Sequence, residues 1–456
     1  MFWKIKRIHF IGIGGTGMSG IAEVLFNLGF KVQGSDLKKS PYTERLEKLG
    51  IKIFYGHSSQ NVKDADLVVI SSAINENNEE FKEALRLKIP VIKRGEMLAE
   101  LMRMKYGIAV SGTHGKTTTT AIAASVLHEA GLDPTVIIGG IFQKINSNVK
   151  LGKSQFLLAE ADESDKSHLK LFPVFAVITN IDLDHLDVYK DLEDIKSTFA
   201  EFASKVPFFG SVILNADDKN SLDIIPLIKK RVVKFGFSSD ADYRIVNVKA
   251  EKGRYLFEVF ERGKSLGEFC LKVPGRFNIQ NSASVIALAR ELEINVESIK
   301  KGIEAYTGTK RRCEVVGENE NIKVITDYAH HPVEIETTLN AISEFYGTKK
   351  ILAVFQPHRY TRTYALFDKF ASCFPEWVET VLLPIYPAGE LPIENVSSFS
   401  LCEEIENRGN RCFYAKNKEE VFDYLKDNLN SYNVIVFLGA GYIDSYAREF
   451  GEFVSG

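Results

Sequence analysis

Apolar and polar residues follow two alternating patterns along this chain. Short apolar runs, such as 5–11, 106–110 and 155–161, have the length of buried strands. The segments between such runs carry their apolar residues at helical spacing. Strands that alternate with helices form parallel sheets covered by helices. The pattern therefore predicts an α/β protein.

The pattern also divides the chain into three regions. The first holds the expected strands 5–11, 31–34, 51–54, 66–71 and 90–92 and the helices 18–28 and 95–104. The central region adds the strands 106–110, 155–161, 174–181 and 211–215, and then 243–249, 254–261 and 266–273, which alternate like antiparallel strands exposed on one face. The third returns to strict alternation, with strands at 323–327, 351–355, 378–384 and 434–438. We expect domains at 1–102, 103–308 and 309–456.

Composition narrows the class of protein. A chain of 456 residues with 45% hydrophobic residues and a net charge of −3 is long enough for about three domains and offers no electrostatic case for nucleic acid or a membrane surface. No apolar run reaches the length of a bilayer span, and the charged N-terminus leads directly into a strand. The five scattered cysteines argue against a disulfide framework or a zinc site. We expect a cytoplasmic protein without membrane insertion.

The segment 106–129 carries the most specific signal. An apolar strand leads into Gly112-Thr-His-Gly-Lys-Thr-Thr118, and a helix follows. In such phosphate-binding loops, backbone N–H groups and the helix N-terminus surround the phosphates, the lysine neutralises charge, and the next hydroxyl holds Mg²⁺. The common pattern has a glycine where this chain has Val110, so this loop is a shorter version. The segment predicts a nucleoside triphosphate site.

A second glycine-rich turn lies near the N-terminus. The pattern Gly12-x-Gly14-x-x-Gly17 joins the first expected strand to a helix, and Asp36 ends the next strand, where a ribose-binding acid is expected. Any nucleotide diphosphate supplies the pyrophosphate that such a turn binds. NAD and a UDP-sugar are both compatible with these residues.

Polar side chains also follow two central strands. The acidic segment 160–165 ends one apolar strand, and the segment 179–187, which includes His185, ends the next. Carboxyl ends of parallel strands share one edge of a sheet, so we expect both segments near Thr117. Glu160, nearest the apolar strand, is our candidate for a Mg²⁺-binding carboxylate.

The third region ends its first two strands in a similar way. The segment 327–332 follows one strand, and 356–362 follows the next. His358, Arg359 and Arg362 form an expected cationic pocket suited to a small carboxylate.

These motifs are together similar to those of the Mur ligase family of peptidoglycan synthesis. The similarity covers essentially the whole chain and is carried by the segments 11–18, 112–118, 160–164, 184–187, 277–281, 308–312, 327–332 and 358–362. It implies an N-terminal Rossmann-like UDP-binding domain, a central P-loop ATPase-type mononucleotide-binding domain, and a C-terminal Rossmann-like domain that brings the amino acid. It further implies ATP and Mg²⁺, with only small molecules as partners.

Within the family, the chain most resembles the ligases that join L-alanine to the carboxylate of UDP-N-acetylmuramate. The resemblance implies that an acyl phosphate forms first, with release of ADP, and that the amine of alanine then displaces phosphate. The expected catalytic residues are Lys116, Glu160, His185 and Arg312. Several family members carry a carbamylated lysine after the metal-associated histidine; Lys196 is the nearest lysine here, but no motif matches it.

The resemblance also implies binding residues. Those for ATP are Gly112, Thr113, His114, Gly115, Lys116, Thr117, Thr118, Asn278, Asn281, Arg312 and Asp327. Those for the UDP-sugar are Gly12, Gly14, Gly15, Thr16, Gly17, Met18, Asp36, His57 and Ser72. Those for the amino acid are Tyr328, His358, Arg359 and Arg362, and those for the metal are Thr117, Glu160 and His185.

Three other functions compete with this interpretation. An NAD-dependent oxidoreductase would use the first glycine turn but leave the triphosphate loop without a role. A P-loop ATPase switch would leave the basic pocket of the third region without one. A recycling ligase that adds a whole tripeptide to the same sugar nucleotide shares almost every motif, and the form of the segment 12–18 favours the alanine enzyme over it.

Overall fold

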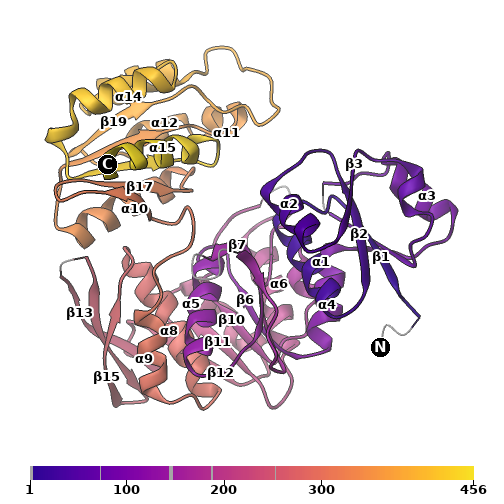
Figure 1. The fold of residues 1–456 in the computed structure, drawn as a ribbon. Coiled ribbons are helices and arrows are strands. Elements are labelled where there is room, and N and C mark those ends of the chain that lie inside the picture. Colours follow the sequence, from indigo (N-terminus) through magenta and orange to yellow (C-terminus); the bar gives the residue numbers. More distant parts are fainter. Residues whose placement is uncertain (1–3, 72, 143–146, 186–187, 252) are drawn as a thin grey trace. The chain divides into compact units, whose positions relative to one another are not determined.

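The computed structural model describes residues 4–71, 73–142, 147–185, 188–251 and 253–456. Its strands form three sheets, as the three-region pattern predicts (Figure 1). The chain divides into two compact units, of which the first comprises 1–247, 257–269 and 280–306, and the second 248–256, 270–279 and 307–456. Each unit is described below on its own.

The first sheet has the strand order β3-β2-β1-β4-β5 and is parallel throughout. Its strands are β1 (Arg7–Ile11), β2 (Lys31–Asp36), β3 (Lys52–Tyr55), β4 (Leu67–Ile70) and β5 (Val91–Lys93). The accompanying helices are α1 (Thr16–Asn27), α2 (Pro41–Lys48), the 3₁₀ turn η1 (Ser59–Val62), α3 (Glu79–Arg86) and α4 (Arg94–Arg103). The order reverses on either side of β1, so the glycine turn after β1 lies at the point where ligands bind in such sheets.

The central sheet has the order β15-β14-β13-β12-β11-β10-β6-β9-β7-β8. Its strands are β6 (Tyr106–Ser111), β7 (Thr135–Phe142), β8 (Ser147–Lys150), β9 (Phe156–Glu160), β10 (Phe175–Ile178), β11 (Ser211–Asn215), β12 (Val232–Gly236), β13 (Tyr243–Ala250), β14 (Tyr255–Glu261) and β15 (Lys264–Leu271). The helical segments are α5 (Lys116–Glu129), η3 (Ser167–Lys170), α6 (Leu192–Ser204), α7 (Lys219–Ile224), η4 (Ile225–Leu227), α8 (Arg276–Glu291) and α9 (Val296–Glu304). β6 lies between β9 and β10, so the ends of these three strands are neighbours, as expected.

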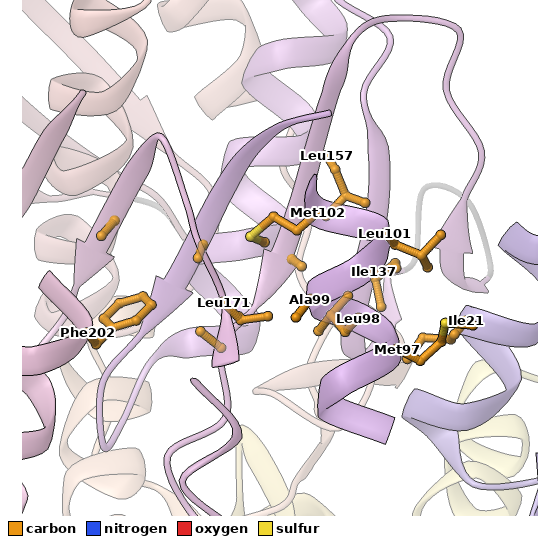
Figure 2. Packing of buried hydrophobic residues seen from close by; sticks show 14 of the residues in the cluster. Ile21, Met97, Leu98, Ala99, Leu101, Met102, Ile137, Leu157, Leu171 and Phe202 are labelled. Carbon is orange, nitrogen blue, oxygen red and sulfur yellow. The ribbon is translucent and has the colours of Figure 1, made fainter. Parts of the chain in front are cut away.

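Helix α4 joins the cores of the first two sheets. Its apolar residues from Met97 to Met102 are buried in one continuous hydrophobic cluster. Figure 2 shows Met97 beside Ile21 of α1, and Leu101 and Met102 near Ile137 and Leu157 of the central region. Fully burying one such side chain contributes about 1.5–3 kcal/mol. This shared core explains why both sheets belong to one compact unit.

The third sheet has the order β16-β17-β21-β18-β19-β20, and β16 is its antiparallel edge strand. The strands are β16 (Glu314–Glu318), β17 (Lys323–Asp327), β18 (Ile351–Phe355), β19 (Val378–Leu382), β20 (Cys412–Tyr414) and β21 (Val434–Leu438). The helical segments are α10 (Pro332–Tyr346), α11 (Tyr360–Ala365), α12 (Phe367–Ser372), α13 (Ser398–Asn407), α14 (Lys418–Asp427), η5 (Leu429–Ser431) and α15 (Ile443–Ser455). β17 and β18 flank β21, so the segments that follow β17 and β18 share one edge.

One expectation from the cysteine pattern is wrong. Cys402 of α13 and Cys412 of β20 form a disulfide, with their Cα atoms 5.5 Å apart. The two residues are separated by only ten positions, and the helix packs directly on the strand. Spacing along the sequence does not reveal this packing, which brings the two sulfur atoms together.

Candidate functional site

The triphosphate loop is held by the end of the neighbouring strand β10. Thr113 N donates to the Asn180 carbonyl at 3.1 Å, and His114 N donates to Asn180 Oδ1 at 2.9 Å. The hydroxyl of Thr179 donates to the His114 carbonyl at 2.5 Å. Part of the polar segment after β10 therefore braces the loop, a role that the sequence did not indicate.

Glycine is required at both ends of this loop. Gly112 has a φ of +136°, and a Cβ there would lie 2.0 Å from Thr179 Oγ1. Gly115 has a φ of +83° and is the N-cap of α5, which begins at Lys116. A side chain at Gly115 would meet Asn281 at 2.9 Å. The loop thus leaves its backbone accessible at the positive end of a helix dipole, the arrangement that binds phosphate.

Lys116 is folded back into its own loop. Its Nζ donates to the Gly112 carbonyl at 2.6 Å and the Thr113 carbonyl at 3.1 Å. It also forms an ion pair with Glu163 at 2.7 Å, and the Glu163 side chain is only 3% exposed. The other carboxylate oxygen of Glu163 is buried without a hydrogen-bond partner among the described residues. Lys116 must exchange at least the Glu163 contact before it can neutralise a phosphate.

Glu160 and Thr117 lie together at the start of α5, as the sequence predicted. Thr117 Oγ1 donates to Glu160 Oε2 at 3.2 Å, while Gly139 N of β7 donates to Glu160 Oε1 at 2.8 Å. Burial raises the pKa of Glu160, and the Gly139 hydrogen bond and the charge of Lys116 oppose that rise. A hydroxyl and a carboxylate oxygen at this spacing are donors of the kind that Mg²⁺ prefers, with phosphate and water oxygens completing its octahedron.

His185 approaches the same acids from the β10 side. Its Nε2 lies 3.7 Å from Glu163 Oε1, and its backbone has a φ of +53°. Hydrogen bonding to Glu163 raises the pKa of His185, and burial opposes this. The structure therefore brings Lys116, Glu160 and His185 to one sheet edge and adds Glu163 to them. Asp187, in the same motif, lies outside the described residues.

The N-terminal glycine turn is built from backbone hydrogen bonds. Gly12 N and Ile13 N both donate to the Ser35 carbonyl, at 2.9 and 3.0 Å. Gly14 N donates to Asp36 Oδ2 at 2.8 Å. A Cβ on Gly14 would lie 2.9 Å from that same oxygen, so glycine is needed for the close approach. Asp36 thus occupies the predicted position at the end of β2, where it holds the turn.

Other predicted UDP-sugar residues fall into three groups. Gly15 caps α1, and Thr16 and Gly17 form its first turn. Met18 is 1% exposed, and its side chain belongs to the hydrophobic core, so a ligand contact has to come from its backbone. Ser72 lies outside the described residues.

Arg94 is a residue that the sequence reasoning missed. It begins α4 and pairs with Asp162 at 3.3 Å and Asp165 at 3.7 Å. A Cβ on Gly17 would lie 3.1 Å from its Cδ. Arg94 therefore connects the first glycine turn with the acidic segment after β9. The sequence motifs include Gly17, Asp162 and Asp165, but the spacing of these residues does not indicate that Arg94 lies between them.

In the second unit, Asp327 ends β17 and holds two chain segments. It accepts hydrogen bonds from Cys313 N at 2.7 Å and Ala329 N at 2.8 Å. Burial raises the pKa of Asp327, and the charge of Arg312 opposes the rise. The guanidinium of Arg312 lies 5.4 Å from the centre of the Tyr328 ring. Arg312, Asp327 and Tyr328 are thus neighbours within this unit.

The predicted amino-acid pocket is less cationic than expected. The His358 ring stacks on Tyr386 at 5.4 Å, and Arg362 Nη1 lies 3.4 Å from His358 Nδ1. Burial and the charge of Arg362 lower the pKa of His358 to about 4, so this histidine is neutral at pH 7. Arg359 is exposed at a φ of +72°. The positive charge of the pocket therefore comes from the arginines.

The two predicted adenine-side asparagines are both buried on α8. Asn278 Nδ2 donates to the Pro274 carbonyl at 2.6 Å, and Asn281 lies against Gly115 in the first unit. The described residues contain no group of three or more His, Cys, Asp or Glu side chains arranged to hold a metal on their own. Nor does any described helix have the length and apolarity needed to cross a bilayer.

Family models match the chain in three consecutive parts. They are the Mur ligase catalytic domain over residues 7–106, the Mur ligase middle domain over 110–289, and the Mur ligase glutamate ligase domain over 311–441.

Whole-length relatives agree with these matches. The UDP-N-acetylmuramate–L-alanine ligases of Sulfurihydrogenibium sp. (strain YO3AOP1) and Geotalea daltonii are 51% and 50% identical to this chain. These alignments cover 99% and 97% of this chain and 98% and 97% of the relatives. The crystal structure of the UDP-N-acetylmuramate–alanine ligase MurC from Thermotoga maritima matches with a TM-score of 0.82 and 31% identity, covering 98% of both chains. With the three α/β domains and both glycine loops in place, the chain belongs to the Mur ligase family.

Proposed function

We propose that this chain is an ATP-dependent ligase that joins L-alanine to the carboxylate of UDP-N-acetylmuramate in peptidoglycan precursor synthesis. The observation that carries the proposal is a pair of contacts at the end of β9. Lys116 forms an ion pair with Glu163, and Thr117 donates a hydrogen bond to Glu160. Full-length relatives that are named for this activity support the choice of substrates.

ATP is the triphosphate of Mur ligases, and the loop after β6 is suited to hold it. The backbone N–H groups at the N-terminus of α5 would face the phosphates, and Lys116 would move from Glu163 to the β- and γ-phosphates. We assign ATP binding to Gly112, Thr113, His114, Gly115, Lys116, Thr117, Thr118, Asn278, Asn281, Arg312 and Asp327.

A divalent cation fits beside this loop. Thr117 and Glu160 present a hydroxyl and a carboxylate oxygen 3.2 Å apart, and His185 lies on the adjoining strand end. These three residues would hold Mg²⁺, which when bound would neutralise phosphate charge. The Glu163 carboxylate, with its Oε1 3.7 Å from His185 Nε2, adds a further acceptor beside these residues.

The reaction we propose has two displacements. A carboxylate oxygen of UDP-N-acetylmuramate forms a bond to the γ-phosphorus, and the bond to the β,γ-bridging oxygen breaks to release ADP. The alanine nitrogen then attacks the acyl carbon, phosphate leaves with its bridging oxygen, and the nitrogen loses a proton. Lys116 would lower the repulsion between the anionic carboxylate and the triphosphate, which is the main electrostatic obstacle to the first step.

The other two substrates have sites on separate sheets. The turn after β1 takes the diphosphate of the UDP-sugar at the N-terminus of α1, with Asp36 and His57 beside it. The arginines of the second unit suit the alanine carboxylate, and neutral His358 and Tyr328 line the same edge. We accordingly assign 1–102, 103–308 and 309–456 to UDP-sugar, ATP and amino acid, and place the enzyme with these substrates in the cytoplasm.

The proposal is tested by phosphate release from ATP in the presence of UDP-N-acetylmuramate. Parallel reactions contain L-alanine, the cell-wall tripeptide or no amine, each with and without Mg²⁺. Release with alanine alone is the expected result. Release with the tripeptide alone would identify a recycling ligase, and equal release without any amine would identify an ATPase.

A further inference from the structure

A completely buried carboxylate lies beneath the first glycine turn. Glu80, in the first turn of α3, is 0% exposed. Asn78 caps this helix, with its side chain accepting hydrogen bonds from Glu80 N and Phe81 N. A carboxylate at a helix N-terminus is favoured by the helix dipole. Its neighbour Glu79 is exposed, so the two adjacent acids have different environments.

Glu80 collects polar groups from four separate segments. Its Oε2 accepts from Ser35 Oγ of β2 at 2.5 Å and lies 3.4 Å from His9 Nε2 of β1 and 3.3 Å from His57 Nδ1. Its Oε1 accepts from Asn61 Nδ2 of η1 at 2.5 Å. Burial on its own would raise the pKa of Glu80, but hydrogen bonds from His9, Ser35 and Asn61 outweigh it and lower the pKa to about 2. Glu80 is therefore a buried anion at neutral pH.

This anion determines where the proton of His57 resides. The hydroxyl proton of Ser35 is donated to Glu80, so Ser35 Oγ presents only lone pairs to His57 Nδ1, 3.1 Å away. Both atoms that face Nδ1 are hydrogen-bond acceptors, which requires the proton to be on Nδ1. In the neutral ring, Nε2 is then an acceptor. No residue that the structure describes hydrogen-bonds to this Nε2.

His57 stands where the nucleotide is expected. Gly56 N, just before it, donates to the Asp36 carbonyl at 2.9 Å, and Asp36 holds Gly14 of the glycine turn. The His57 side chain is 16% exposed, so the ring has one buried nitrogen and one side that solvent or a ligand can reach. An acceptor nitrogen at this point can recognise a hydrogen-bond donor on a uridine nucleotide, namely a ribose hydroxyl or the N3–H of the base.

We propose that Glu80 is a positioning residue for the sugar nucleotide: through Ser35 it holds His57 with its proton on Nδ1, leaving Nε2 to accept a hydrogen bond from the uridine. This inference rests on the proposed function, because it takes the turn after β1 as the UDP site. Glu80 itself does not touch the ligand.

The first test reads the tautomer directly. In protein labelled with ¹⁵N-histidine, the ring nitrogens of His57, assigned with a His57→Gln variant, should show a protonated Nδ1 and an unprotonated Nε2 at pH 8. A protonated Nε2 in the ligand-free wild-type protein would overturn the inference. This measurement does not depend on catalysis or on any substitution at Glu80.

The second test removes the anion while keeping its shape. In Glu80→Gln, the Kd for UDP and the KM for UDP-N-acetylmuramate should rise about tenfold, the effect of one misdirected hydrogen bond, while the KM for ATP stays unchanged. The exposed neighbour provides the control, since Glu79→Gln should match wild type. Ser35→Ala, which removes the group between Glu80 and His57, should act in the same direction. Unchanged UDP binding in both Glu80→Gln and Ser35→Ala would overturn the inference.

Nucleotide analogues identify the donor. Kd values for 2′-deoxy-UDP, 3′-deoxy-UDP and N3-methyl-UDP are compared between wild type and Glu80→Gln. The analogue that lacks the recognised donor should bind both proteins equally, and a full difference with all three analogues would contradict the inference. A wild-type protein that binds no UDP at all would reject the proposed function, whereas the tautomer result would still report on Glu80.

Discussion

Two glycine turns in this protein follow a buried parallel strand and cap a helix, yet they differ in charge. The turn after β1 is held by Ser35 and Asp36, and the residues that form it include no cation. The loop after β6 contains Lys116, which is paired with Glu163, and Thr117, which contacts Glu160. Backbone N–H groups suffice to bind a diphosphate that does not react. A phosphoryl group that is transferred needs positive charge, and Lys116 would supply it if the second loop binds ATP as we propose.

The two loops also differ in the buried group beside them. Beneath the first lies Glu80, which hydrogen bonds keep ionised. Next to the acidic segment of the second lies His168, 0% exposed and packed against Phe199 and Phe202, with neither ring nitrogen hydrogen-bonded among the described residues. Burial lowers the pKa of His168 to about 4, so it is neutral at pH 7. The buried group near the first turn is therefore a charged carboxylate, whereas the one near the second loop is a neutral imidazole.

The largest effect should come from removing the cation of the second loop. Lys116→Ala should lower phosphate release by about 10²–10³-fold, because a preorganised group facing the transition-state charge is lost. UDP binding, measured by calorimetry, should not change. The exposed Lys153→Ala is the matched control. Loss of UDP binding in Lys116→Ala would contradict the assignment of UDP and ATP to separate loops.

Removing the carboxylate that holds the first turn should weaken UDP binding and leave ATP binding unchanged. Asp36→Ala leaves Gly14 N without its charged acceptor, a contact worth about 1.5–3 kcal/mol, so UDP affinity should fall by about 10–100-fold. The KM for ATP should remain that of wild type. Steady-state kinetics with each substrate varied in turn separate the two effects; an equal rise in both KM values would show that the turns are not independent.

The buried histidine should make stability sensitive to mild acid. The folded pKa of His168, about 4, lies below its unfolded value near 6.5, so the unfolded state takes up the proton first as pH falls. The contribution of neutral His168 to the free energy of unfolding is fully present above pH 6.5 and is lost progressively towards pH 4. At pH 5 the loss amounts to about 2 kcal/mol. Urea unfolding of His168→Leu should lack this loss, while the exposed His128→Gln should retain it. For Glu80 the corresponding loss falls lower, between pH 4.5 and 2.

The smallest expected effect concerns Lys196. It pairs with Asp223 at 2.8 Å and Glu193 at 3.0 Å, and the hydrogen bond to Asp223 raises its pKa. Carbamylation requires a neutral amine, so the structure favours a charged lysine here. Lys196→Arg keeps the charge but cannot be carbamylated, and its phosphate-release rate should stay within about twofold of wild type. A large loss in Lys196→Arg, together with a wild-type rate that rises with added bicarbonate, would show that the reaction depends on a carbamate at Lys196.

Sequence reasoning found both loops because each combines a motif with a strand period before it and a helix after it. It found Glu160 and His185 because strand order places their segments at one edge. It missed Glu163 as the partner of Lys116, because the segment 160–165 offers several acids and only the folded turn after β9 decides which one faces the loop. Arg94 was missed for a related reason: its partners are about 70 residues away.

The hairpin of β7 and β8 was also not predicted. Its sequence lacks clear alternation, yet Gly139 N binds Glu160 and Asn148 donates to the Thr16 carbonyl of the first turn. These contacts join the hairpin to residues that are distant in the sequence, so its own residue pattern does not reveal them. Likewise, Met18 follows a nucleotide-binding motif but its side chain is taken up by the core. The His358 charge depends on burial, which its basic neighbours in the sequence do not reveal.

The position of Val110 explains the short form of the second loop. Val110 is fully buried within β6, in register with Glu160 on one side and Val177 on the other, so the strand continues where the common pattern already turns. The turn is delayed until Gly112, where the Thr179 hydroxyl leaves no space for a side chain. A text search that demands a glycine at position 110 would pass over this chain. A search for the geometry, a glycine tight against the neighbouring strand and a lysine opening the helix, would retrieve it.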